Sequence, residues 1–379
     1  MNTSERPTVL RSTRFQAPGE PLPLRRRLGI HNQVVRALRG YLQDHGFVEV
    51  PVPQLTAATG SSEVVDSAFS LDDFGNLAFP RQTGQLFLEE LVAGGLDRVY
   101  CEGESLRREW KQDERHLTEF KLVEVEARDL DLADLVALQE ALLKHVLLQL
   151  DADLVGGRHV TRLERVVCSE HPRLTYREAL TALNRRGWSM PFGEDLHRDA
   201  EAALVRYCGN LPVHVTHWPE QLEFFNARLH PADPTVVESV DYVLPHAGET
   251  CGGSVREADA STLERRLHES AMYRHLRRRA REFAQIRAAA RAPGGRHRDV
   301  DELIADSQAG IDEAFGAYLA RFAPRPVPRA GFGLGVARLL QFVMGLDSIK
   351  DAVVYPLDRT SLGAAAGRGD ALHSSAGIA

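Results

Sequence analysis

One polar stretch of the sequence, "LRREWKQDERHLTEF", gathers charged and aromatic residues of the kinds that bind a nucleotide. Strand-like segments flank a polar connection, and alternation of side chains puts Arg107 and Glu109 on one face of the first strand. Arg107, Arg115 and His116 could hold phosphates. Glu109 could accept from an adenine amino group, and Phe120 could stack on the base. A solvated charged hairpin is the alternative, and it would be favoured if the segment stood alone.

Possible partners for this hairpin occur later in the chain. Asp241 and Glu249 flank a short strand-turn, and two carboxylates near a triphosphate are the usual way to hold Mg²⁺. An ordinary pair of surface acids would look the same. Ser254 and Arg256 follow two glycines on a strand whose backbone can come close to a ligand. These partners weaken the interpretation of the hairpin as a merely solvated one.

A third candidate is the glycine-rich stretch "RAGFGLGVARLLQFVMGL", which predicts a strand that runs into a helix. Gly335 permits close approach of a ligand, and Arg338 at the start of the helix could meet terminal phosphates and cover adenine. The pattern is neither a P-loop nor GxGxxG, so by itself it is a weak signal. A helix-surface arginine is the ordinary alternative.

The elements that must position these residues follow the order helix, strands, helices, strands, helix. Residues 25–46 carry a helical period, and Thr175 with Glu178 forms a capping box at the start of another helix. This order predicts an α+β fold in which helices flank an antiparallel β-sheet, and not a βαβ nucleotide fold. We expect a flexible arm over 1–24, one domain over 25–360 and a disordered tail over 361–379.

Composition limits the class of protein. With 43% hydrophobic and 26% charged residues, the 379-residue chain is typical of a soluble globular protein. We expect no membrane span and no secretory signal, and therefore a cytoplasmic location. The four cysteines are scattered without zinc-ligand spacing, which predicts reduced thiols. A net charge of −7 argues against a general nucleic-acid binder.

Three of these segments together resemble a known family. "FVEVPVP", "GESLRREWKQDERHLTEF" and "GFGLGVAR" look like motifs 1, 2 and 3 of class II aminoacyl-tRNA synthetases. "RHLTEF" and "GETCGGSVRE" resemble the asparaginyl members and the related archaeal asparagine synthetases. The resemblance covers roughly residues 25–359, and the motifs stand in the family's order. It implies the family's antiparallel sheet with flanking helices, and ATP and Mg²⁺ as ligands.

The resemblance also implies a role for particular residues. The catalytic residues would be Arg107 and Arg338. Magnesium would be held by Asp241 and Glu249. The ATP ligands would be Arg107, Glu109, Arg115, His116, Phe120, Glu249, Gly335 and Arg338. The amino acid would be bound by Glu63, Gln85, Glu89, Ser254 and Arg256.

Substrate choice is predicted from one position in "QLFLEE". Aspartyl enzymes of this family carry a lysine shortly after the "QL", whereas this chain has Glu89 and no lysine. An anionic acceptor beside Arg256 suits a carboxamide, whose NH₂ donates and whose C=O accepts. Glu89 therefore favours asparagine, or an aspartate bound in another orientation. A salt bridge with a neighbour is the alternative role for Glu89.

Several departures from the family suggest an altered task. Fewer than thirty residues precede motif 1, so we expect no anticodon-reading OB-fold domain. The substrate loop reads "SSEVVDS" (Ser61–Ser67) where glycines are usual, the usual glutamate before the motif 3 arginine is Ala337, and Asn226 replaces an expected tyrosine. Loop closure and substrate size are therefore open from the sequence.

We predict an AMP-forming ligase that makes an adenylate of asparagine, aspartate or a close analogue, and passes the acyl group to ammonia, an amine, a small molecule or a carrier. A minimal asparaginyl-tRNA synthetase and a non-catalytic amino-acid or adenylate sensor are the alternatives. Intact ligand positions count against the sensor.

Partners are predicted from two segments. The motif 1 segment Arg25–Pro53 would form a homodimer. Nine arginines lie between Arg274 and Arg298, where Glu282 is the only acid, so this basic segment could meet tRNA or an acidic carrier protein weakly. A solvated helix with internal ion pairs is the alternative for the basic segment.

Overall fold

The computed structural model describes residues 22–59, 67–108, 113–289 and 299–364. Most of the predicted arm and tail, and the substrate-loop residues 61–66, lie outside these ranges. Helix α12 (Arg359–Ala364) takes in the first four residues of the predicted tail. No helix within the described ranges combines the length and the apolarity that crossing a bilayer requires.

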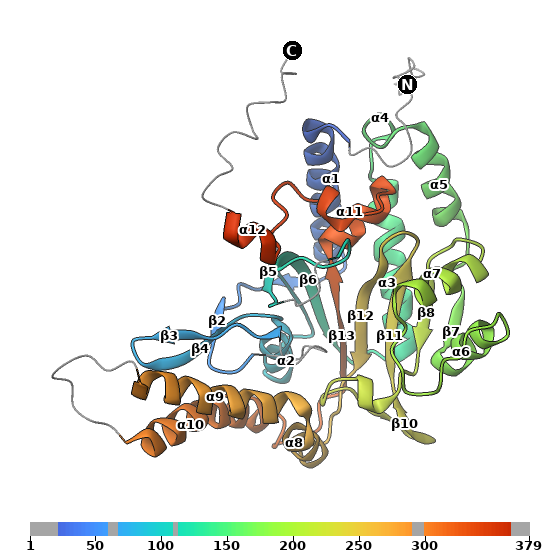
Figure 1. Ribbon diagram of the computed structural model, residues 1–379. Helices are drawn as coiled ribbons and strands as arrows, with labels where there is room; N and C mark the ends of the chain where they lie inside the picture. The colour runs from blue at the N-terminus through green and yellow to red at the C-terminus, as the bar shows by residue number, and fades with distance from the viewer. Residues whose placement is uncertain (1–21, 60–66, 109–112, 290–298, 365–379) are drawn as a thin grey trace, which may run out of the picture.

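An eight-stranded sheet forms the centre of the molecule (Figure 1). Most neighbours are antiparallel, as predicted, but the two outer pairs, β1 with β5 and β7 with β8, are parallel. Two small sheets accompany it, in the orders β10–β9 and β2–β4–β3. In spatial order the strands of the large sheet are β1 (Val48–Glu49), β5 (Arg98–Leu106), β6 (Glu119–Arg128), β13 (Arg329–Gly335), β12 (Gly248–Val255), β11 (Ser239–Leu244), β8 (Val213–Thr216) and β7 (Arg173–Thr175). The small sheets contain β2 (Leu55–Thr56), β3 (Leu71–Asp73), β4 (Asn76–Pro80), β9 (Leu229–His230) and β10 (Asp233–Val237).

Helices surround the sheet in three groups (Figure 1). The first group packs in the largest core: α1 (Leu24–Asp44), α3 (Leu132–Leu148), α4 (Ala152–Val155), α5 (Gly157–Cys168) and α11 (Val336–Met344). The second group shares a separate core: α2 (Gln85–Ala93), α8 (Ala260–Glu269), α9 (Ala271–Ala289) and α10 (Val300–Ala320). The third consists of α6 (Tyr176–Asn184) and α7 (Arg198–Tyr207). The described residues also include the 3₁₀ turns η2 (Glu220–Leu222) and η3 (Ile349–Asp351).

The predicted capping box is present at the start of α6. The Thr175 side chain accepts from the Glu178 backbone N–H, and the Glu178 carboxylate accepts from the Thr175 backbone N–H. Two N–H groups that helix formation leaves without partners are thereby satisfied. This prediction from spacing alone is confirmed.

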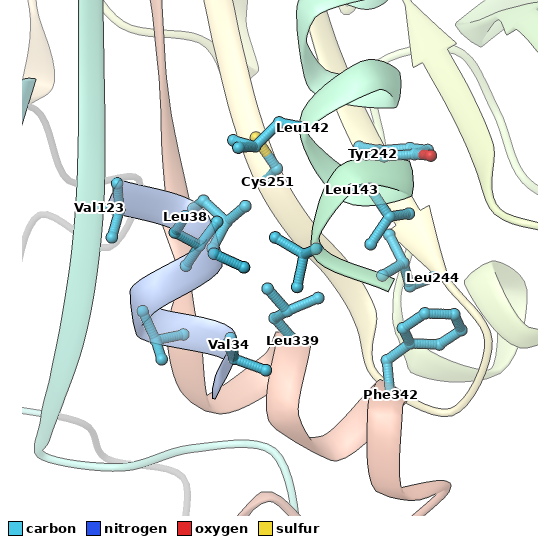
Figure 2. Close-up of a cluster of buried hydrophobic side chains, with 14 of the residues drawn as sticks. Val34, Leu38, Val123, Leu142, Leu143, Tyr242, Leu244, Cys251, Leu339 and Phe342 are labelled. Carbon is cyan, nitrogen blue, oxygen red and sulfur yellow. The ribbon is translucent and has the colours of Figure 1, made fainter. Parts of the chain in front are cut away.

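The two faces of the central sheet serve different purposes. On β6, Val123 and Val125 point into the largest core, whereas the intervening Glu124 lines a cavity on the opposite face. On β13, Phe332 lies in the same core and Gly333 lines the cavity. Figure 2 shows how α1, α3 and α11 fill the core face with side chains such as Leu38, Leu142 and Leu339. Because side chains alternate along a strand, burial of one face leaves the polar set on the other. The polar face is where the candidate site lies.

Candidate active site

A cavity of about 210 Å³ opens on the polar face of the sheet and gathers residues from several distant segments of the chain. Its lining includes eleven of the predicted nucleotide, metal and amino-acid ligands. These residues are Arg107, Arg115, His116, Phe120, Asp241, Glu249, Ser254, Arg256, Gln85, Gly335 and Arg338. Glu63 and Glu109, which were also predicted, lie outside the described residues.

The β5–β6 hairpin supplies a cation over an aromatic ring. The Arg107 guanidinium carbon lies 5.2 Å from the centre of the Phe120 ring, and the Arg107 backbone N–H donates to Thr118 O at 2.8 Å. Phe120 packs at its base against Leu117 and Ala337. A positive charge above a supported aromatic face provides both a phosphate ligand and a surface on which a planar base can stack.

A second group of possible phosphate ligands lies where the hairpin connection returns to β6. Arg115 pairs with Glu201 of α7 at 2.5 Å, and His116 Nδ1 lies 2.5 Å from Asp113 Oδ1. Burial opposes ionisation of Asp113, but hydrogen bonds from the Arg115 backbone and from His116 leave its pKa below the usual value. Asp113 therefore stays anionic and holds His116 at the cavity.

Asp241 and Glu249 converge over Gly252, which pairs with Asp241 across β11 and β12. A side-chain carbon at Gly252 would lie 2.8 Å from Glu249 Oε1 and 3.2 Å from Asp241 Oδ1, so glycine leaves the space that both carboxylates occupy. The described residues contain no group of three or more metal-ligating side chains. A phosphate-bound Mg²⁺ needs only one or two carboxylates, because the phosphates and water supply the other oxygens. This pair fits such an ion.

Arg338 of α11 contacts Glu249, one of the two carboxylates. Its Nη1 donates to the backbone oxygen of Glu249 and lies 3.4 Å from Glu249 Oε2. Glu249 N in turn donates to Glu201 Oε1 at 3.1 Å. Burial raises the pKa of Glu201, while the neighbouring Arg115 and Arg338 lower it. Arg115, Glu201, Glu249 and Arg338 thus form one network at the end of the cavity that holds the carboxylate pair.

A different set of polar groups lines the part of the cavity near β12. Arg256 lies 3.2 Å from Glu126 Oε2 and donates to Ser254 Oγ at 2.6 Å. Burial raises the pKa of Glu126 to about 7, although Arg256 lowers it. A side chain at Gly331 would overlap the Glu126 carboxylate, so this pair depends on glycine. The charge of Arg256 is therefore already partly compensated before any substrate arrives.

The comparisons with known proteins agree with this geometry. Residues 22–359 match the family described as tRNA synthetases class II (D, K and N). The chain belongs to this family.

Several relatives within the family are asparaginyl enzymes. The asparaginyl-tRNA synthetase of Mus musculus is 28% identical over 356 residues, which cover 87% of this chain and 66% of that protein. The asparagine–tRNA ligase of Microcystis aeruginosa is 30% identical over 360 residues, with coverage of 88% and 70%. The solved Pyrococcus horikoshii asparaginyl-tRNA synthetase, complexed with asparaginyl-adenylate, superposes with a TM-score of 0.73 at 28% identity, covering 88% of this chain and 69% of that one. The chain thus spans about two thirds of the length of these class II relatives.

The structure corrects the role predicted for Glu89. In this class II chain Glu89 is fully buried in α2 and does not line the cavity. Its Oε2 accepts from Arg329 Nε at 2.9 Å and from Tyr318 Oη at 2.8 Å, and its Oε1 accepts from Asn226 Nδ2 at 2.7 Å. The prediction that Glu89 reads a substrate amide is therefore wrong, because its oxygens are committed to the protein interior. The ordinary alternative, a salt bridge with another residue, is what the fold contains.

Sequence reasoning missed a different acid, Glu223. It follows η2, lines the cavity, and lies close enough to Arg256 for the two charges to interact. Burial raises its pKa to about 7, with Ser239 and Arg256 opposing and Glu249 contributing. No motif or periodicity marks Glu223, since only the packing of the η2 segment beside β12 brings it to the cavity.

Several arginines of helix α9 form ion pairs with acids. Arg277 forms an ion pair with Asp312 of α10, and Arg279 reaches Glu282 at 2.9 Å. Arg287 lies 3.5 Å from Asp72 on β3. Acids are scarce near α9 in the sequence, but the fold supplies them from two other elements. Ion pairs therefore account for Arg277, Arg279 and Arg287, but two of the three acids come from other elements and not from the helix itself. Arg291, Arg296 and Arg298 lie outside the described residues.

Proposed function

We propose that this chain activates asparagine with ATP, forming asparaginyl-adenylate and releasing pyrophosphate. The observation that carries the proposal is the distribution of charge along one cavity. The cations proposed to bind phosphate and a carboxylate pair line one part of the cavity, and the compensated Arg256 lies just past the C-terminal end of β12. The solved Pyrococcus relative that shares the fold is described as a complex with asparaginyl-adenylate.

The chemistry needs positioning and neutralisation of charge and no nucleophile from the protein. The substrate carboxylate attacks the α-phosphorus in line, the bond from phosphorus to the bridging oxygen breaks, and pyrophosphate leaves with that electron pair. Arg107 would neutralise the α-phosphate and the attacking carboxylate, and Phe120 with Arg338 would hold the adenine between them. Asp241 and Glu249 would hold Mg²⁺, which supplies further neutralisation of the outer phosphates.

Specificity for the side chain would rest on Arg256 and Glu223 instead of Glu89. Arg256 donates to the carboxamide oxygen, and Glu223 accepts from the carboxamide nitrogen. Glu126 already offsets the charge of Arg256, so ionised Glu223 adds a negative charge that would repel an aspartate carboxylate. This arrangement favours asparagine over aspartate.

As the acceptor we favour tRNA, because the curated relatives that cover most of this chain are asparagine–tRNA ligases. Ammonia, an amine or a carrier, which the sequence suggested first, then become outcomes of the acceptor assay. The assay incubates the protein with labelled asparagine, ATP and either total tRNA, ammonium or hydroxylamine. Labelled aminoacyl-tRNA that forms with the parent and not with Arg107→Ala supports tRNA charging. A labelled product that forms only with ammonium or hydroxylamine contradicts it.

A homodimer through motif 1 is part of the proposal. Leu28 of α1 and Val48 of β1 are exposed, and β1 is an edge strand whose two residues are both exposed. An exposed edge strand beside exposed apolar side chains is suited to pairing with a second copy. Sedimentation equilibrium should report a dimer, and replacement of Leu28 and Val48 by Asp should shift it to the monomer. A parent protein that is monomeric at micromolar concentration would contradict this part.

The central test is ATP–pyrophosphate exchange measured across the standard amino acids. We expect exchange with asparagine, reduced about 100-fold in Arg107→Ala and in Arg338→Ala, since each removes a charge-assisted contact to a developing charge. The matched control is Arg186→Ala, which removes an exposed arginine outside the cavity. Unchanged exchange in both cavity variants would refute the assignment of the site.

The specificity proposal is tested by Glu223→Gln. The variant should lower the preference for asparagine over aspartate in kcat/KM by about tenfold or more, because a like-charge repulsion has been removed. In the parent the preference should rise from pH 6 to pH 8 as Glu223 and Glu126, each with a pKa of about 7, ionise, and the rise should be smaller in Glu223→Gln. The exposed Glu269, which pairs with Arg265, provides Glu269→Gln as the control. A preference that neither Glu223→Gln nor pH alters would exclude Glu223.

A further inference from the structure

A second cavity, of about 620 Å³, lies beside the first and shares Arg115 with it. Its walls come from α5, α7 and the turn between β11 and β12. No predicted ligand other than Arg115 belongs to it. The proposed adenylation site therefore leaves this cavity unexplained.

The charge of the second cavity is strongly positive for an acidic protein. Five arginines face it, Arg115, Arg162, Arg165, Arg198 and Arg206, against two carboxylates, Glu201 and Asp347. The whole chain has a net charge of −7. Cations concentrated in a concave site focus the field on an anionic ligand.

Most of these cations have no carboxylate of their own. Within the described residues Arg162, Arg165, Arg198 and Arg206 form no ion pair. Arg165 donates to the backbone oxygen of Gly209 at 2.8 Å, which leaves its charge uncompensated. In the surface helix α9, by contrast, arginines meet acids supplied by the fold. The guanidinium groups of Arg165, Arg198 and Arg206 are exposed, so an anion from outside the chain can reach them.

Arg162 is the most constrained of the five. Its Nη2 donates to the backbone oxygens of Phe342 and Val343 at the end of α11, at 2.6 and 3.0 Å. Its Nε and Nη1 are buried and meet no acceptor among the described residues. Burial lowers the pKa of Arg162 to about 10, as expected for a cation without an anion nearby. These two nitrogens have almost no exposed surface, so Arg162 contributes positive charge at the wall of the cavity and not a direct contact through them.

Arg115 connects the two cavities. It pairs with Glu201, which in turn accepts from the backbone of Glu249 in the first cavity. Gly248 makes this possible, because its φ is +73° and a side-chain carbon there would lie 2.6 Å from Glu201 Oε2 and against the Arg115 guanidinium. An anion that binds Arg115 from the second cavity would compete with Glu201 for the same guanidinium.

We propose that this second cavity binds a small polyphosphate, and that inorganic pyrophosphate leaving the first cavity is its ligand. Planar guanidinium groups pair with phosphate oxygens in a bidentate manner, and their number here suits a ligand with several negative charges. Arg115 at the junction can hold the departing pyrophosphate from either side. The inference rests on the proposed adenylation only for the source of the ligand, and binding itself can be measured separately.

The test is calorimetric titration of the full chain with inorganic pyrophosphate. In one titration the first cavity of the parent is saturated with α,β-methylene-ATP. In a second titration the protein is Arg338→Ala, whose first cavity has lost a phosphate ligand. One site should be observed in both cases, with affinity that falls steeply as salt is raised. The double variant Arg198→Ser/Arg206→Ser should weaken it at least tenfold. Both arginines are exposed, so folding is retained.

The matched control is Arg185→Ser/Arg186→Ser, which removes the same charge from an exposed segment that lines neither cavity. It should bind pyrophosphate as the parent does. The proposal is overturned if pyrophosphate binds neither the protein saturated with α,β-methylene-ATP nor Arg338→Ala. It is also overturned if the two double variants bind pyrophosphate equally well. Displacement of pyrophosphate by a short single-stranded RNA that binds more tightly would assign the cavity to nucleic acid and also overturn it. Absence of pyrophosphate exchange would instead refute the proposed function, without affecting this titration.

Discussion

Replacing Glu89 by Gln should destabilise the fold and should not act through direct contact with substrate. The carboxylate is fully buried and accepts from Arg329, Tyr318 and Asn226. Glutamine keeps the shape but removes the charge, which leaves the buried Arg329 guanidinium uncompensated. Breaking one partner of a buried ion pair costs about 3–5 kcal/mol.

The expected change in melting temperature follows from the size of the chain. An unfolding entropy of about 2.1 cal/mol/K per residue gives about 0.8 kcal/mol/K for 379 residues. A loss of about 3–5 kcal/mol then lowers Tm by about 4–6 °C. Differential scanning calorimetry and urea titration measure the two quantities on the same protein.

The neighbouring Glu90 provides the control. It lies 3.8 Å from Arg321, whose side chain is 61% exposed, so Glu90→Gln should cost less than about 1 kcal/mol. Exchange kinetics decide between the two roles of Glu89. A Glu89→Gln protein as stable as Glu90→Gln, but with a raised KM for asparagine, would refute the structural role and restore the one that the sequence suggested.

Three further predictions concern other parts of the fold. Burial lowers the pKa of His214 from 6.5 to about 3, so the unfolded chain binds more protons and stability is lost as pH falls below about 6.5. At pH 5 the loss of stability from His214 amounts to about 2 kcal/mol. His214→Phe should therefore reduce the difference in free energy of unfolding in urea between pH 7.5 and pH 5 by about 2 kcal/mol. The same difference in the parent and the variant would contradict this prediction. Gly248→Ala should separate Arg115 from Glu201 and lower the rate of pyrophosphate exchange even at temperatures well below the Tm of the variant. A variant with a lower Tm but an unchanged exchange rate would contradict the link between the cavities. Asp312→Ala should lower stability by about 1 kcal/mol at low salt and less at 1 M salt, because its pair on α9 is partly exposed; a cost that salt does not change would argue against an ionic contribution.

The sequence by itself determined the local features of this protein. The spacing of Thr175 and Glu178 placed a helix start, since a capping box needs only residues three positions apart. Arg107 and Arg338, which the family motifs single out, line the same cavity although they are far apart along the chain. Residue type and short spacing carry this information, because strand alternation and helix capping are decided within a few residues.

Only the tertiary structure decided which long-range partners meet. Glu89 has a residue type suited to binding an amide, but the chain brings Arg329 to it across 240 positions and buries both. Glu223 carries no motif, and the packing of η2 beside β12 puts it in the cavity. Arg277 is far from acids in sequence but meets Asp312 of α10. A charged side chain binds a ligand or a neighbour according to what the fold places within about 4 Å of it, and that contact is not encoded in any short stretch of sequence.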